Sequence, residues 1–382
     1  RLAVGGRFND YAAMTQGPRY TALVDRLPAS VPFVGPETAE RERGRPFKAR
    51  IGANESVFGP SPKAIEAMAR EASETWKYGD SLSYDLRMAL ADRLGVGAGN
   101  IIVGEGIDGL LGYLVRLVVG EGDKVVTSFG AYPTFNYHVT GFGGELVTVP
   151  YRDDHEDPEA LIAKAGEVGA KLVYIANPDN PMGTWHDAAT IQRMIDAVPD
   201  GTLLVLDEAY LEFAPEGTAP AIDPDDARVI RMRTFSKAYG MAGARVGYAI
   251  GAEPLITAFN KIRNHFGMAR ISQAGALAAL HDDAWLAQVQ GKVSAARDRL
   301  AEIARENGLT SLPSATNFVA IDCGADGDFA RRVLAELVAR DIFVRMPFAA
   351  PEDRCVRVSV GHPEDMDAFA EALPQALAAA RA

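Results

Sequence analysis

Cysteine is scarce in this chain of 382 residues, which contains only Cys323 and Cys355. Both lie among apolar residues with the pattern of a strand, so we expect two buried thiols and no disulfide framework. This use of cysteine favours a reducing compartment, and we expect the protein to work in the cytoplasm.

Long apolar runs and an excess of positive charge are also missing. No run is long enough to cross a bilayer, which argues against a membrane-spanning protein. The formal net charge of −12 argues against a nucleic-acid partner, because binding to phosphate backbones requires basic patches. The histidines show no paired spacing typical of metal ligands, and we expect no metal site. Small-molecule partners are favoured.

Apolar residues make up 48% of the chain, and its length exceeds what one hydrophobic core usually spans. Residues 1–47 are rich in Pro, Gly and Arg without a sustained period, which predicts an N-terminal arm with one short helix. Over residues 48–265, helical stretches alternate with the β-rich runs NIIVG, DKVVTS, ELVTVP, KLVYIA, TLLVLDEAY, RVIRMRTFS and RVGYAIG. Apolar runs separated by helices predict a large doubly wound α/β domain with a mainly parallel sheet.

The C-terminal part, residues 266–382, has a different pattern. A helix-rich stretch is followed by the strand-like runs SATNFVAIDC, DIFVRMPF and CVRVSVG, by the helical run DFARRVLAELVAR between them, and by a final helix. The pattern predicts a smaller α+β domain.

A glycine motif raises the question of which phosphate the protein holds. Gly104, Gly106 and Gly109 form G-x-G-x-x-G between a strand-like run and a helical one, and Asp123 lies roughly where a dinucleotide-binding fold places its ribose-binding acid. Taken alone, the motif suggests a nicotinamide or flavin dehydrogenase. The same turn into a helix N-terminus would hold any phosphate, so the rest of the chain must decide.

Three strand-like runs end in polar clusters, where ligands gather in open α/β sheets. NPDNPMG contains Asn180, DEAYLEF begins at Asp207, and RTFSKAYGMAGAR contains Lys237. Each cluster also has an ordinary interpretation, as a proline-stiffened turn, a capping acid or a solvated loop. Together the clusters provide groups that suit an aldehyde cofactor with a pyridine ring. A lysine can hold such a cofactor as a Schiff base, and an aspartate can keep the pyridine nitrogen protonated. Cations and hydroxyl groups for a phosphate tail are supplied by Thr234, Ser236 and Arg245.

The sequence resembles the fold-type I pyridoxal-phosphate aminotransferases of class I/II, and most closely their histidinol-phosphate aminotransferase branch. The resemblance covers nearly all of the chain through GANES, GEGIDGLL, AYPTF, NPDNPMG, DEAYLEF, RTFSKAYGMAGARVGY, TNFV and VRVSVG, which occur in the family's order. It implies an aminotransferase with pyridoxal 5'-phosphate as cofactor, 2-oxoglutarate as the amino acceptor and histidinol phosphate as the favoured donor.

The resemblance also implies roles for individual residues. Lys237 would bond the cofactor and move the proton, and Asp207 would pair with the pyridine nitrogen. Asn180 and Tyr210 would bond the ring's phenolic oxygen, and Tyr132 would stack on the ring. The phosphate contacts would come from Ile107, Asp108, Thr234, Ser236, Arg245 and, across a homodimer, Tyr78. The substrate would be oriented by Asn54, Arg345 and Arg357.

Two residues depart from the branch and bear on the substrate. Phe33 stands where a tyrosine that reaches the substrate is common, and Gly109 stands where an acid is common. Aromatic or other amino acids are therefore alternative donors, and a phospho-amino-acid decarboxylase is an alternative with the same cofactor. The dehydrogenase explains only the glycine motif. A transcription regulator built on this fold would need an added basic DNA-binding module, for which the chain has neither the length nor the charge.

Overall fold

The computed structural model describes residues 17–29 and 34–382 and divides the chain into two units, 1–32 and 33–382. The first unit contains the helix α1 (Ala22–Arg26), whose first turn is capped by the hydroxyl of Thr21. The second contains α2 (Pro36–Arg43) and all later elements. The N-terminal region was predicted to hold one short helix, and its described residues contain two.

The larger sheet of the second unit has seven strands in the order β2-β8-β7-β6-β5-β3-β4. Strand β8 runs antiparallel to both of its neighbours, and the other pairs are parallel. All seven predicted β-rich runs form its strands, which are β2 (Ile101–Gly104), β3 (Lys124–Ser128), β4 (Glu145–Val149), β5 (Leu172–Ala176), β6 (Leu203–Asp207), β7 (Val229–Thr234) and β8 (Gly247–Ile250).

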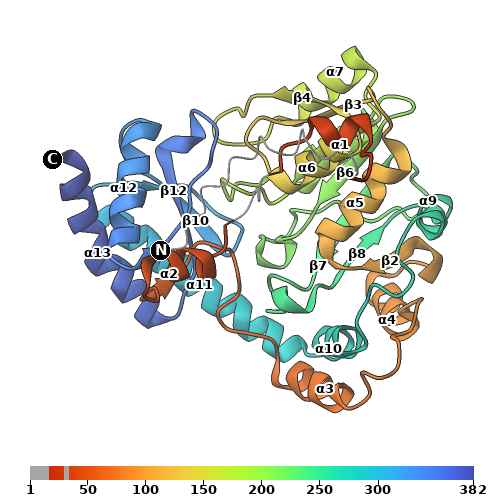
Figure 1. Ribbon diagram of the computed structural model, residues 1–382, viewed down its shortest axis with the longest axis horizontal. Coiled ribbons are helices and arrows are strands. Elements are labelled where there is room, and N and C mark those ends of the chain that lie inside the picture. Colours follow the sequence, from red (N-terminus) through yellow and green to blue (C-terminus); the bar gives the residue numbers. More distant parts are fainter. Residues whose placement is uncertain (1–16, 30–33) are drawn as a thin grey trace. The chain divides into compact units, whose positions relative to one another are not determined.

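Helices cover both faces of this sheet (Figure 1). In β5, Leu172 and Tyr174 join a core with α5 (Gly106–Val118) and α6 (Pro133–Gly141), whereas Val173 joins a core with α7 (Pro158–Val168) and α8 (Ala188–Asp196). Because side chains alternate across a strand, a strand that is apolar at every position must be covered on both sides. The predicted doubly wound, mainly parallel sheet is confirmed.

The C-terminal part of the chain forms a second, smaller layer of strands and helices. An antiparallel sheet has the order β12-β10-β9, with β9 (Thr310–Ser311), β10 (Phe318–Asp322) and β12 (Cys355–Ser359). The helices α12 (Gly327–Ala339) and α13 (Pro363–Arg381) pack together beside it (Figure 1). The predicted smaller α+β part is therefore present, although β11 (Ile342–Phe343) pairs with β1 (Ala49–Arg50) and not with this sheet.

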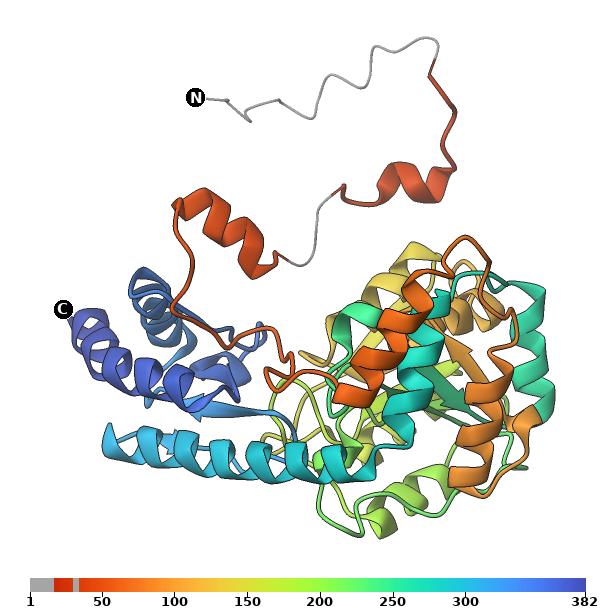
Figure 2. The same ribbon diagram turned by 90° about the horizontal axis from the view of Figure 1, so that it is seen from below.

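The long helix α11 (Asp283–Glu306) connects the two sheets (Figure 2). It packs on β9 and β10, and its Gln290 and Arg297 donate to backbone oxygens that follow β6. The remaining helices are α3 (Pro62–Ala72), α4 (Tyr84–Leu94), α9 (Glu253–Ala258) and α10 (Arg270–Leu280), and α10 packs along α3 and α4. Short 3-10 turns are η2 (Ala98–Asn100), η3 (Leu211–Phe213), η4 (Ala242–Ala244), η5 (Phe259–Lys261) and η6 (Glu352–Arg354). The division at residues 47 and 265 stays a prediction.

Both cysteines are buried as free thiols. In the described part of the chain, no helix combines the length and the apolar character needed to cross a membrane. The same residues contain no cluster of side chains suited to a metal ion.

Candidate active site

The carboxyl ends of three neighbouring parallel strands bring the predicted polar clusters together. Strand β6 ends at Asp207, β5 is followed by the turn that contains Asn180, and β7 is followed by the loop that contains Lys237. Because these strands pair in parallel, their following loops lie at one edge of the sheet. The candidate site is at this edge.

Lys237 lies in a buried hydrogen-bonded group. Its Nζ donates to the backbone oxygen of Asn54 at 3.0 Å, and the Nδ2 of Asn54 donates to the Tyr210 hydroxyl at 3.1 Å. Burial, helped by the positive charge of Arg357, lowers the pKa of the Lys237 amine to about 8. A larger fraction of the amine is therefore neutral near pH 7 than in an exposed lysine, which suits it to nucleophilic attack.

Asp207 is a buried carboxyl group at the end of β6. It is 4% exposed, and it accepts hydrogen bonds from the Tyr174 hydroxyl at 2.8 Å and the Ala209 N–H at 3.0 Å. Among the described residues, no cation forms an ion pair with it, and burial raises its pKa to about 6. An ionised carboxylate in such a place requires a positive group brought by a ligand.

A cradle for an anion forms where the loop after β7 meets the N-terminus of α5. The Ser236 Oγ lies 2.9 Å from the Thr234 hydroxyl and 3.5 Å from Nη1 of Arg245. Nη2 of Arg245 is 3.4 Å from the backbone oxygen of Glu105, just before α5. The N–H groups of Ile107 and Asp108 belong to the first turn of that helix, where N–H groups lack helical partners.

Two glycines make this approach possible. A Cβ at Gly106 would collide with the guanidinium of Arg245, and a Cβ at Gly247 would lie 2.8 Å from the nitrogen of Ile107. Gly106 also has a φ of 81°, which a side chain would strain. The carboxylate of Asp108 points to His138 Nε2 at 2.7 Å, so its backbone N–H is what this residue can offer an anion.

Two arginines of the C-terminal part reach the same region. Arg357 Nη1 donates to the Asn180 side chain at 2.6 Å, while its Nε is buried and has no hydrogen-bond partner. Arg345 pairs with Arg357 through the backbone and donates to the Val34 oxygen at 2.7 Å. Neither forms an ion pair with a carboxylate of the described residues, so two guanidinium groups are left for an anionic ligand.

Two aromatic residues and one unplaced residue complete the predicted set. Tyr132 ends the loop before α6, and burial, with smaller effects from the charges of Asp108 and Asp207, raises the pKa of its hydroxyl. Tyr78 is 78% exposed, and its ring centroid lies 4.9 Å from that of Phe266 in a tilted arrangement. Phe33 lies outside the described residues.

Several residues of the site were missed from the sequence. Tyr174 bonds Asp207 from the preceding strand, Asn317 Nδ2 donates to the Asn54 backbone oxygen at 3.1 Å, and the Ser359 hydroxyl donates to the Asn54 side chain at 2.9 Å. The alternation of side chains along β5 could have indicated Tyr174, because it pairs with Val205 two residues before Asp207. The contacts of Asn317 and Ser359 join distant parts of the chain and leave no local pattern.

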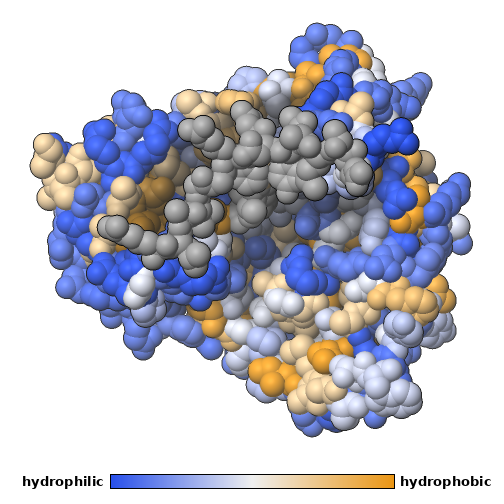
Figure 3. Space-filling view, in the orientation of Figure 1, coloured by the Kyte–Doolittle hydropathy of each residue, from blue (hydrophilic) through white to orange (hydrophobic). Residues whose placement is uncertain are grey.

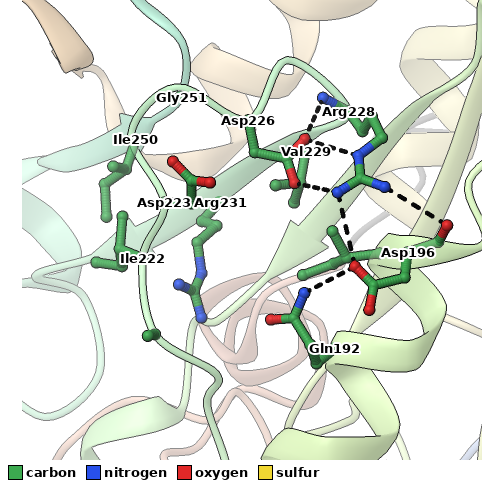
Figure 4. Close-up of a pocket in the computed structure, with 12 residues that line it drawn as sticks. Gln192, Asp196, Ile222, Asp223, Asp226, Arg228, Val229, Arg231, Ile250 and Gly251 are labelled. Atoms are coloured by element: carbon green, nitrogen blue, oxygen red, sulfur yellow. Dashed lines mark hydrogen bonds and ion pairs between the residues drawn. The ribbon is translucent and has the colours of Figure 1, made fainter.

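Another cavity, of about 190 Å³, lies near the opposite ends of the strands (Figure 4). It is lined by Val229 at the start of β7 and by charged residues that already have partners. Arg228 pairs with Asp226, and Arg231 pairs with Glu208. We place the candidate site at the carboxyl ends instead, because Lys237, Asp207 and Arg357 there form no ion pair with any described residue.

Comparisons with known proteins identify the family of this chain. Residues 48–373 match the model of the family described as aminotransferase class I and II. A crystal structure of a histidinol-phosphate aminotransferase from Sinorhizobium meliloti in complex with pyridoxal-5'-phosphate superposes with a TM-score of 0.93 and 53% identity, covering 96% of this chain and 99% of that one. The histidinol-phosphate aminotransferase 1 of Mesorhizobium japonicum is 36% identical over 86% of this chain and 90% of its own length. That of Moorella thermoacetica is 32% identical over 94% of both.

Proposed function

Because this chain belongs to the class I and II aminotransferases, pyridoxal-phosphate-dependent transaminases of fold type I, we propose that it moves an amino group from histidinol phosphate to 2-oxoglutarate. The family, the fold, the enzyme class and the cofactor predicted from the motifs are confirmed at this level. The observation that carries the proposed donor is the pair Arg345 and Arg357, two guanidinium groups that form no ion pair with a carboxylate in residues 17–29 and 34–382. We further propose a place in histidine biosynthesis and in the cytoplasm, which the names of the relatives and the two free buried thiols support.

The residues at the site fit pyridoxal phosphate. A protonated pyridine nitrogen would supply the cation that buried Asp207 lacks. The cradle of Thr234, Ser236, Arg245 and the α5 N-terminus has the donors that a phosphate requires. The Lys237 amine, with its pKa lowered to about 8, is suited to bond an aldehyde.

In the proposed mechanism, side chains of this chain bind the cofactor and transfer the proton. When bound, pyridoxal phosphate supplies an aldehyde that bonds amines and a ring that takes up electron density from the substrate. With the cofactor bound, Asp207 would pair with the ring nitrogen, and Tyr210 and Asn180 would hydrogen-bond the phenolic oxygen. Lys237 Nζ would take up the proton from the substrate Cα as a general base and release it again as a general acid.

Substrate orientation falls to the residues around Asn54. Asn54 touches both Lys237 and Tyr210, and Arg357 is held beside it by Asn180 and the Gly52 oxygen. The buried Nε of Arg357 has a free donor for an anionic oxygen. Donor and acceptor bind in turn at one site, so Arg357 must accept more than one anion.

A panel of amino donors tests the proposed substrate. Histidinol phosphate should react faster than histidinol, its matched control, by about 10- to 150-fold in kcat/KM, because each charge-assisted bond contributes about 1.5–3 kcal/mol. The cofactor's absorbance change and CO₂ release are recorded together. A response to phenylalanine but not to histidinol phosphate would overturn the donor assignment, and CO₂ release without amine transfer would favour the decarboxylase.

We also propose a homodimer with shared active sites. Apolar side chains gather at the lower edge of the face in Figure 3, over α3, α4 and α10 of Figure 1. Around these helices the exposed apolar residues are Ile65, Trp76, Tyr78, Leu82, Tyr84, Met88 and Phe266. An exposed patch with several aromatic residues is typical of a protein interface, and the resemblance implies that Tyr78 contacts the phosphate in a partner's site.

Complementation between two inactive variants tests the shared site. Neither Tyr78→Ala nor Lys237→Ala alone should support wild-type turnover. After random subunit exchange, about one quarter of the wild-type activity should return, because half of the dimers are mixed and each has one intact site. Exchange demonstrated by mass spectrometry without any recovery would contradict sharing.

A further inference from the structure

Two buried carboxyl groups contact each other beneath the turn that contains Asn180. Glu156 lies just before α7, Asp179 lies just after β5, and each is 2% exposed. Glu156 is held next to Asp179 because its side chain accepts from the Ala176 N–H, three residues before Asp179. At this separation the charge of each carboxylate acts on the other.

The other partners of the two groups are neutral donors. Glu156 accepts from the Ser128 hydroxyl at 2.7 Å and the Ala176 N–H at 2.8 Å. Asp179 accepts from the Tyr151 hydroxyl at 2.9 Å and the Met182 N–H at 2.8 Å. In the described part of the chain, no lysine, arginine or histidine forms an ion pair with either carboxyl. Two adjacent negative charges without a cation would be costly at such depth, so one carboxyl holds a proton.

We propose that Glu156 and Asp179 share one proton in the folded protein, and that this pair positions the turn that presents Asn180 to Arg357. Asp179 is the residue before Asn180, and its side chain and backbone hold the turn at Met182, Gly183 and Thr184. The single negative charge that remains on the pair attracts Arg357. Glu156 and Asp179 are positioning residues, and their effect on substrate rests on the proposed function. The shared proton does not depend on the proposed function.

Other ionisable groups surround the pair, and their charges set its pH dependence. From the neighbouring elements these are Tyr151, Tyr174, His186, Glu352 and Arg357. Burial raises the pKa of both tyrosines and lowers that of His186, so these three are neutral near pH 7. The negative charge of Glu352 contributes to the raised pKa of Tyr151. The positive charge of Arg357 attracts the Asp179 carboxylate and acts to lower its pKa.

The sign of the pH effect follows from the proton. Burial and the neighbouring charge raise the pKa of Glu156 well above the usual carboxyl range, so above about pH 4.5 the folded chain binds more protons here than the unfolded chain. This contribution to stability is complete at low pH and is lost as the pH rises through the raised pKa. Glu156→Gln keeps a hydrogen donor but removes the titration.

The experiment measures the unfolding free energy of the full chain, saturated with pyridoxal phosphate, from pH 5 to 8. Between these limits the unfolding free energy of the wild type should fall more steeply with pH than that of Glu156→Gln. The difference between the two slopes should correspond to at most one bound proton. Glu212→Gln is the matched control, because it removes another buried acid, whose pKa burial raises to about 7. Glu212→Gln should also change the slope of unfolding free energy against pH, but it should leave the KM for 2-oxoglutarate unchanged. Equal slopes for the wild type and Glu156→Gln would overturn the shared proton.

Kinetics at pH 7 test the positioning role. Asp179→Asn and Glu156→Gln should keep the KM for 2-oxoglutarate within about threefold, whereas Asp179→Leu should raise it about tenfold, the loss of roughly one hydrogen bond to a charged group. Equal KM values for Asp179→Asn and Asp179→Leu would overturn the positioning role. If Asp179→Leu does not fold, Glu156→Ala replaces it in the same comparison. A wild type inactive with every donor contradicts the proposed function and leaves the slope measurement valid.

Discussion

Replacing Lys237 by alanine is expected to lower kcat for amine transfer by about 10⁴-fold or more, while the protein stays folded and binds pyridoxal phosphate through its phosphate. The substitution removes both the amine that bonds the cofactor and the base that moves the Cα proton, and a positioned base alone contributes about 10²- to 10⁴-fold. Single-turnover absorbance with histidinol phosphate measures the loss.

Lys292 provides the control for this substitution. It is exposed on α11, where its amine lies 5.4 Å from the centroid of the Phe58 ring. Lys292→Ala should retain wild-type kcat. A small primary amine added to Lys237→Ala should restore part of the activity, because it can enter the space left by the side chain. Turnover by Lys237→Ala within about tenfold of the wild type would remove Lys237 from the mechanism.

Asp207→Ala is expected to cause the second-largest loss, about 10²- to 10⁴-fold in kcat. Removing one partner of a buried charge pair costs about 3–5 kcal/mol, and the ring nitrogen would then lose its proton. Asp207→Asn keeps the size of the side chain and should be nearly as damaging, which separates charge from packing.

Tyr174→Phe is the graded control for Asp207, because it removes one hydrogen bond from the carboxylate and keeps its charge. We expect a loss of about tenfold and a further rise in the pKa of Asp207, so activity should fall at a higher pH on the acid side. Steady-state rates from pH 5 to 8 measure this shift. An Asp207→Asn protein with wild-type kcat would show that the ring nitrogen needs no carboxylate partner.

The sequence predicted those parts of the fold that have a local pattern. The apolar runs along β5, β6 and β7 are continuous because both faces are covered, and the polar residues that follow them lie at one edge because the strands are parallel. Asp207, Asn180 and Lys237 could therefore be grouped before the structure was known.

Other parts of the site depend on contacts between distant residues. Asn54 meets Ser359 and Asn317, more than 260 positions away, and no periodicity signals such pairs. The contact between Glu156 and Asp179 was missed for the same reason, because each acid alone has the pattern of a turn or a helix start. The pairing of β1 with β11 likewise joins residues 49–50 to residues 342–343. The role of Tyr78 depends on a second chain and stays a prediction.

Borohydride reduction identifies the lysine that bonds pyridoxal phosphate. The wild-type protein is incubated with pyridoxal phosphate, reduced, digested and mapped by mass spectrometry, with Lys237→Ala and Lys292→Ala treated in parallel. We expect one stoichiometric pyridoxyl group on Lys237 in the wild type and in Lys292→Ala, and none at a specific site in Lys237→Ala. An unmodified Lys237, or stoichiometric labelling of another lysine, would contradict this expectation.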